Sequence, residues 1–99
     1  MSINKVIIVG NVGQNPDIKA MSNGAEIAFL NIATGEKWKD KDGSPKERTD
    51  WHRVAIFNPN LVKIAKDYIK KGSKVYVEGP IRNNEWVDEQ GVKRYSNQI

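Results

Sequence analysis

The chain has no cysteine, a single histidine, and no apolar run long enough to cross a membrane. The lack of cysteine excludes a disulfide framework and any thiolate metal site. A single histidine argues against metal chemistry, and we expect neither a metal nor another cofactor. Residues 1–5 lack the charged and apolar regions of a secretory signal, so we expect the protein to remain where it is made.

At 99 residues, the chain has room for one domain with one modest core. Its net charge of +4 is too mild to identify a nucleic-acid partner by itself. The distribution of charge is more informative, because residues 52–75 contain many bases and Asp67 as their one acid. Those bases are Arg53, Lys63, Lys66, Lys70, Lys71 and Lys74. The alternative explanation of this cluster is a solvated helix face.

Residues 46–57, KERTDWHRVAIF, predict a strand that ends at the Asn58-Pro59-Asn60 breaker. Side chains alternate along a strand, so Trp51, Arg53 and Phe57 lie on one face. The two aromatic rings are then roughly 20 Å apart, with a guanidinium between them. This pattern suits the stacking of successive bases of an unpaired nucleic acid. Core aromatics of a β-barrel would give the same pattern, and the strand taken alone favours that interpretation of Trp51 and Phe57.

Other segments also have the residue types of strands and tight turns. Ser22-Asn23-Gly24 predicts a hairpin turn, and Pro80 ends or bends the strand before it. The last segment, residues 81–99, predicts a hairpin with its turn near Gly91, in which Arg82, Asn84 and Trp86 share a face. The remaining predicted strands are residues 4–10, 17–21, 25–34 and 74–79.

One helix is predicted after the central strand. Leu61, Ile64, Ala65 and Tyr68 recur at helical spacing, which indicates an apolar stripe that packs on the core. Asn60 is the expected N-cap, and residue 72, a glycine, is the expected end.

Residues 35–48, GEKWKDKDGSPKER, are predicted to form a polar loop with Asp42-Gly43 at its tip. Trp38 lies in this loop between Lys37 and Lys39. An exposed indole between cations suits base stacking next to phosphates. The alternative is that the ring folds back onto the barrel.

The segments together predict a mainly β fold with a helix between the third and fourth strands. A five-stranded Greek-key barrel has this order, and it is the oligonucleotide/oligosaccharide-binding (OB) fold.

Three segments carry a resemblance to a known family: NKVIIVGNVGQNPDIK, TDWHRVAIF, and YIKKGSKVYVEGPIR followed by a Trp and then RY. In this order, from about Asn4 to the end, they resemble bacterial-type single-stranded DNA-binding proteins. The resemblance implies one OB-fold domain over residues 1–99, without enzymatic activity. It implies sequence-independent binding and protection of single-stranded DNA in replication, recombination and repair.

The resemblance also implies roles for individual residues. Base-stacking aromatics are expected at Trp38, Trp51, Phe57 and Trp86. Phosphate contacts are expected at Lys5, Lys19, Lys39, Lys46, Arg53, Lys70, Lys71 and Arg82. Family members usually form homotetramers, with subunit contacts expected here at Lys5, Val6, Ile7, Ile8, Val9, His52 and Tyr76. The implied location is the bacterial cytoplasm at the nucleoid, and an organellar or phage origin stays open.

Three departures from the family pattern are visible. Asn84 and Glu85 stand where a basic pair often precedes the last tryptophan, and Ala20 occupies a position that is frequently aromatic. The chain ends at Ile99, inside the expected last strand and before the acidic tail that recruits replication and repair proteins. We therefore expect a fragment, with such partners only if the native chain has the tail.

Three other functions are compatible with parts of the sequence. An RNA ligand, or a role in primosome assembly, would keep the same barrel. An enzyme could use His52 with Asp50 or Glu47, but no nucleophile or phosphate-binding loop completes such a site. A purely structural oligomerisation domain would leave tryptophan fluorescence unchanged by oligonucleotides.

Overall fold

The computed structural model describes the backbone of residues 1–87 and 89–99, and their side chains except those of 84–86 and 93–97. The elements are β1 (Val6–Val12), β2 (Asp17–Ala20), β3 (Glu26–Lys39), β4 (Pro45–Ile56), α1 (Pro59–Tyr68), β5 (Lys74–Gly79), β6 (Arg82–Val87) and β7 (Lys93–Gln98). The predicted strand at residues 74–79 matches β5, and most other predicted strands shift by one or two residues. The predicted turn at Asn23-Gly24 is present, with Gly24 at φ +87°.

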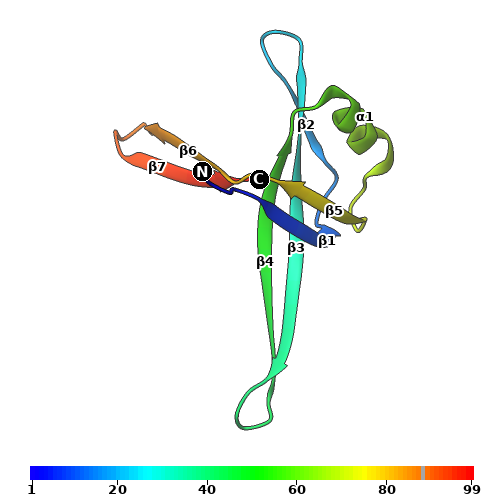
Figure 1. Cartoon of the computed structure of the whole chain (residues 1–99), viewed down its shortest axis with the longest axis vertical. Helices are drawn as coiled ribbons and strands as arrows, with labels where there is room; N and C mark the ends of the chain where they lie inside the picture. Colours follow the sequence, from blue (N-terminus) through cyan, green and yellow to red (C-terminus); the bar gives the residue numbers. More distant parts are fainter. Residues whose placement is uncertain (88) are drawn as a thin grey trace.

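Strand β3 is the centre of a five-stranded antiparallel sheet. One edge of β3 pairs with β4 over twelve residue pairs, and its other edge pairs first with β2 and then with β1. Strand β1 also pairs with β5. Figure 1 shows the resulting arrangement, in which the long β3–β4 ribbon crosses the shorter β1–β5 pair. The molecule is elongated along this ribbon, with extents of 56 × 39 × 35 Å.

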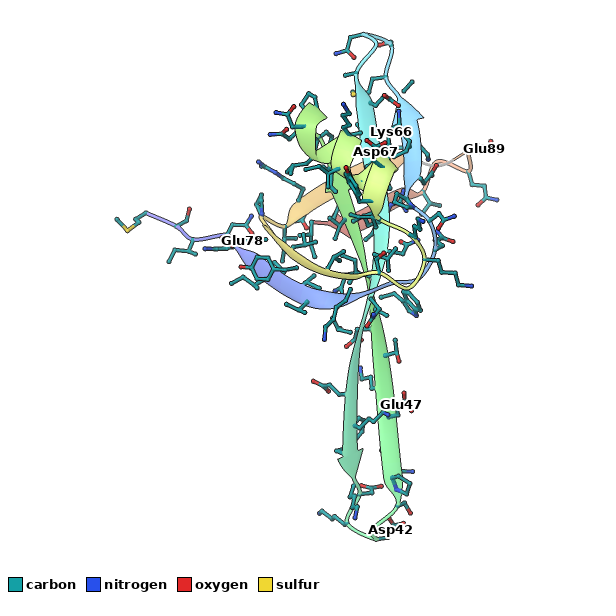
Figure 2. The ribbon with its side chains drawn as sticks, turned by 90° about the vertical axis from the view of Figure 1, so that its right-hand side faces the viewer. Asp42, Glu47, Lys66, Asp67, Glu78 and Glu89 are labelled. Carbon is teal, nitrogen blue, oxygen red and sulfur yellow. The ribbon has the colours of Figure 1, made fainter. Side chains whose placement is uncertain are left out.

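The prediction of a loop at residues 35–48 is wrong, because most of this segment continues the β3–β4 hairpin. The two strands pair as far as Lys39 and Pro45, and only residues 40–44 form the turn. Opposite charges face each other across the hairpin, with Glu36 opposite Arg48 and Lys37 opposite Glu47. Such cross-strand pairs stabilise a ribbon that has no core to pack on. We call residues 35–50 the arm, and it stands clear of the other elements in both views (Figures 1 and 2).

Helix α1 starts two residues earlier than predicted. The Asn58 side chain, and not that of Asn60, caps the helix by accepting from the backbone N–H of Asn60 and Leu61. Pro59 then occupies the first helical position, where its fixed φ and missing N–H are well tolerated. Gly72 lies beyond the helix, at φ +91° in the turn that leads to β5.

The predicted apolar stripe of α1 is only partly buried. Val62 and Ala65 pack on Ala28 of β3, whereas Leu61, Ile64 and Tyr68 are exposed. The helix therefore contacts the sheet through a stripe rotated from the predicted one.

The core lies between the inward faces of β1, β3 and β4. Ile8, Leu30, Ile32 and Val54 form its main cluster, and each is at most 6 % exposed. Inward and outward residues alternate along all three strands, as expected for a sheet with one buried face. Outward side chains of β3, such as Phe29, therefore lie on the opposite face of the sheet and are not part of this core.

The last hairpin, β6–β7, forms a separate two-stranded sheet, and its end returns to β4. The Ile99 N–H donates to the Arg53 carbonyl, and the Ile99 carbonyl accepts from the Ala55 N–H. This pattern is that of a parallel pairing and ties the chain's last residue to the main sheet.

Helix α1 follows four strands, or three if β1 and β2 are counted as one interrupted strand. The fold is thus mainly β with one helix, which is consistent with an OB fold.

Among the helices of the described residues, none is both long and apolar enough to cross a membrane.

Candidate nucleic-acid interface

The outward side chains of β2, β3 and β4 form one continuous surface, which we call the aromatic face. Its members follow from the register, since paired residues on antiparallel strands point to the same side. Trp51 lies opposite Ala33, Arg53 opposite Asn31, and Ala55 opposite Phe29. On the other edge of β3, Lys19 of β2 lies opposite Ile27. The predicted pair of Trp51 and Arg53 thus shares one face, together with residues of two further strands.

Trp51 is a surface residue. Its indole is 62 % exposed, so the interpretation of this side chain as a core aromatic is wrong. The ring rests against Gly13, where a Cβ atom would lie 2.3 Å from Cζ3 and 2.7 Å from Cη2 of Trp51. Gly13 in turn is fixed by donating its N–H to the Asn31 carbonyl at 2.9 Å. The absence of a side chain at residue 13 therefore lets the Cζ3–Cη2 edge of the indole pack closely against the β1–β2 loop.

Phe29 is an aromatic residue of this face that the sequence prediction missed. The Arg53 guanidinium carbon lies 4.5 Å from the centre of its ring, and the Lys19 ammonium lies 5.4 Å from it. Both distances fall within the range of cation–π contacts. One signal was present in the sequence, because strand alternation places Phe29 on the face opposite to that of Ala28 and Leu30. Both faces of this strand are mostly apolar, however, so the sequence did not show which of the two faces is buried.

Two predicted basic residues lie in the α1–β5 loop, which is hydrogen-bonded to the β1–β2 loop. The Lys71 N–H donates to Asn15 Oδ1 at 2.9 Å, and the Gly72 N–H donates to the Val12 carbonyl at 2.7 Å. These bonds tie residues 70–73 to residues 12–15, and Gly13 of that second segment contacts Trp51. The side chains of Lys70 and Lys71 are exposed. The structure therefore places the backbone of these two lysines next to the loop that contacts Trp51.

Trp38 lies apart from this group, on the arm. It pairs with Lys46 and is 46 % exposed. Strand alternation places it on the face of Thr34 and His52, opposite to that of Trp51. Figure 2 shows Glu47 along the arm and Asp42 at its tip, far from Lys66 and Asp67 of α1. Trp38 thus does not fold back onto the barrel, which was the alternative for this residue. Lys39 and Lys46 are exposed near it.

The tip of the arm is a tight turn. Gly43 has φ +81°, and the Ser44 N–H donates to Asp42 Oδ1 at 2.9 Å. Hydrogen bonds from Ser44 hold the pKa of the Asp42 carboxyl below its usual value.

Phe57 and Arg82 lie near the ends of their strands. Phe57 follows β4 directly and is 58 % exposed, and it lines a groove together with Leu61, Ile64 and Tyr76. Arg82 is exposed at the start of β6. Trp86 belongs to β6 and pairs with residue 94, but its side chain lies outside the described part of the structure.

The predicted subunit-contact residues divide between two sides of β1. Val6 and Ile8 point inward and pack against the core, because side chains alternate along the strand. Their contact with a second subunit stays a prediction. Ile7, Val9 and Tyr76 are each more than half exposed on the outer side of β1 and β5.

An ionic network crosses this outer surface. Lys5 forms an ion pair with Glu78, and the Tyr76 hydroxyl donates to Glu78 Oε2 at 2.8 Å. These two contacts lower the pKa of Glu78, with Lys5 as the larger cause. The same contacts raise the pKa of Lys5 and of Tyr76. Lys5, a predicted phosphate contact, is therefore already paired with a carboxylate.

In the alternative hypothesis of an enzyme, His52 would act together with Asp50 or Glu47, but the contacts that the structure gives for His52 and Asp50 are with other residues. His52 Nε2 lies 2.8 Å from the Thr34 hydroxyl, and Asp50 accepts from the Arg48 Nε–H at 3.2 Å. No described cluster of three histidine, aspartate or glutamate residues could hold a metal ion.

Comparison with known proteins identifies the family. A model described as the single-strand binding protein family matches residues 3–99. A solved structure, the Plasmodium falciparum SSB complex with ssDNA, is similar to this chain with a TM-score of 0.90 and 34 % sequence identity. The match covers 100 % of this chain and 86 % of that one. This chain therefore belongs to the single-strand binding protein family.

Proposed function

We propose that this protein binds and protects single-stranded DNA without sequence preference, by stacking bases on aromatic side chains and pairing phosphates with lysine and arginine. The observation that carries the proposal is the exposed Trp51 indole, which lies on a surface that also presents Arg53 and Lys19. An aromatic ring that is neither core nor covered offers its π-face to a ligand.

The family membership supports the same conclusion. Members bind single-stranded DNA and are not enzymes. The solved relative named above is a complex with ssDNA. Stacking on one aromatic residue contributes about 1–3 kcal/mol per base and tolerates every base, because each base has a π-face. A duplex hides those faces between its base pairs, which explains a preference for single strands.

The proposed path of the strand starts from the geometry of the aromatic face. Bases stack on Trp51 and Phe57, and the strand continues along the arm to Trp38. Because Trp38 and Trp51 lie on opposite faces of the ribbon, the strand crosses from one face to the other between them. Trp86 is the fourth proposed stacking residue.

Phosphates are held by basic side chains along this path. The proposed contacts are Lys19, Lys39, Lys46, Arg53, Lys70, Lys71 and Arg82, with Lys5 available after it leaves Glu78. The proposed contacts of Lys70 and Lys71 are supported by the hydrogen bond that ties their loop to Asn15, in the loop that contacts Trp51.

We further propose that the domain is a Greek-key barrel that assembles as a homotetramer and acts in replication, recombination and repair. The parallel hydrogen bonds of Ile99 to β4 support the barrel. The exposed apolar side chains of Ile7, Val9 and Tyr76 support contact with a second copy, because monomers seldom expose such a cluster. His52, half-buried beside Thr34, is a further proposed contact.

The test is a titration followed by tryptophan fluorescence. Oligo(dT) is added at low and high salt, with a DNA duplex and an oligo(rU) of equal length as controls. We expect strong quenching by single-stranded DNA, weakening with salt, and little effect of the duplex. Equal affinity for the RNA would favour an RNA ligand. An unchanged signal, with no binding by anisotropy of a labelled strand, would overturn the proposal.

A further inference from the structure

Phe29 lies between two cations on the aromatic face. Arg53 approaches its ring from β4 at 4.5 Å, and Lys19 approaches from β2 at 5.4 Å. Arg53 lies opposite Asn31 and Lys19 opposite Ile27, so the two cations reach Phe29 from opposite directions along β3. The ring therefore separates two like charges and contacts both.

The surroundings of Phe29 leave these charges available for a ligand. Arg53 takes part in none of the ion pairs found among the described residues. The Lys19 ammonium lies 3.9 Å from Asp17, near the limit of an ion pair, and its side chain is 61 % exposed. An aromatic ring attracts a cation through its quadrupole and does not neutralise the positive charge. Phe29 thus contacts both side chains without neutralising them, and of the two cations only Lys19 has a carboxylate within ion-pair distance among the described residues.

The outward residues of β4 show what an aromatic side chain at residue 29 of β3 contributes to this face. Ala55 is the outward residue of β4 between Arg53 and Phe57, and its methyl group offers no stacking surface. Phe29, the cross-strand partner of Ala55, supplies an aromatic ring beside this position. Without the ring at residue 29, the Arg53 and Lys19 side chains would lose the aromatic surface that both now contact.

We propose that Phe29 is a positioning residue for single-stranded DNA binding: its ring holds the Arg53 guanidinium and the Lys19 ammonium in the geometry that meets the strand between Trp51 and Phe57. This inference rests on the proposed function. Ordering two flexible side chains before the ligand arrives reduces the entropy that binding costs. It also presents the guanidinium plane, backed by a ring, as a surface on which a base can stack.

The test compares Phe29→Leu and Phe29→Tyr with the wild-type protein. Leucine keeps the apolar contact with the sheet and removes the π-face, whereas tyrosine keeps both. For Phe29→Leu we expect a loss of about two- to five-fold in affinity for oligo(dT) for each cation released. Phe29→Tyr should bind as the wild type does. Tyr68→Leu, which changes an aromatic residue that is 75 % exposed on α1, is the matched control and should leave affinity unchanged.

A double-mutant cycle separates positioning from a merely structural role. If Phe29 acts through Arg53, Phe29→Leu and Arg53→Gln together should cost less affinity than the sum of the two single changes. Phe29→Leu combined with Lys71→Gln should be additive, because the ring does not contact Lys71. The Arg53 side-chain protons should also lose their ring-current shift in the NMR spectrum of Phe29→Leu.

Two negative results are distinguishable. If the wild-type protein does not bind oligo(dT), the proposed function fails. If the wild type binds, but Phe29→Leu binds equally well or its cycle with Arg53→Gln is additive, only the role of Phe29 fails. A lower melting temperature of Phe29→Leu with unchanged affinity would likewise assign Phe29 to structure alone.

Discussion

Gly13→Ala is the sharpest available perturbation of the aromatic face. The new methyl group would lie 2.3 Å from Cζ3 and 2.7 Å from Cη2 of the Trp51 indole, well inside van der Waals contact. One of the two groups has to move. Because the indole is 62 % exposed, it can swing outward without disturbing the core. The substitution therefore displaces the proposed stacking ring and leaves the rest of the chain in place.

The expected effects on binding and on stability differ in size. A displaced indole loses part of a stacking contribution of about 1–3 kcal/mol per base, so we expect affinity for oligo(dT) to fall roughly five-fold or more. Overpacking in a closed core costs about 1–3 kcal/mol, and an indole free to move should reduce that cost to below 1 kcal/mol. The melting temperature should accordingly change little.

Affinity is measured by anisotropy of a labelled oligo(dT), and stability by thermal unfolding. Gly79→Ala is the matched control, since a Cβ atom at that position meets no other atom within 4 Å. Two results would refute the reasoning. Unchanged affinity of Gly13→Ala would mean that the position of the indole does not matter for binding. A large loss of stability would mean that Trp51 is held in place by packing and is not a free surface ring.

Three further predictions concern other parts of the molecule. Lys71→Gln should reduce the slope of log affinity against log salt by about 0.7 if this lysine neutralises one phosphate, and an unchanged slope would remove it from the interface. Gly43→Ala forces a side chain into φ +81° and should destabilise the arm by about 1 kcal/mol. Amide exchange should therefore speed up in the arm and not in β1; uniform acceleration would mean that the arm does not open independently. Because the pKa of Glu78 is lowered in the folded state, its contribution to stability is present at neutral pH and is lost as the pH falls through that pKa. Glu78→Gln should flatten the acid side of a plot of melting temperature against pH, and an identical acid limb would assign it to other carboxylates.

Strands with clear local signals were predictable from the sequence. The β-branched run of residues 74–79 gave both ends of β5, and the aromatic run before Asn58 gave β4 to within one residue. The parity of β4 also placed Trp51 and Arg53 on one face. Alternation within one strand needs no knowledge of the rest of the fold, which is why these predictions succeeded.

Features that depend on contacts between distant segments were not predictable in this way. The arm looked like a loop because its paired residues are mostly polar or charged, such as Lys37 and Glu47, and show no apolar strand pattern. The run NKVIIVG did not show which residues face inward, so Val6 and Ile8 were assigned to subunit contacts together with Ile7 and Val9. On α1, the packing angle of the helix decides that Val62 is buried and Leu61 is exposed.

Phe29 illustrates the same limit within the candidate site. Its contacts come from two other strands, β2 and β4, and neither Lys19 nor Arg53 is close to it in sequence. Only the register of the sheet brings the three side chains together.

The central claim is that Trp51 is a base-stacking surface, and one measurement tests it most directly. Replacing Trp38 and Trp86 by phenylalanine leaves Trp51 as the single tryptophan, whose fluorescence is then followed during titration with oligo(dT). The account predicts strong quenching that saturates together with binding measured by anisotropy. Binding without any change in Trp51 fluorescence would contradict it, because a base stacked on an indole alters the emission of that indole.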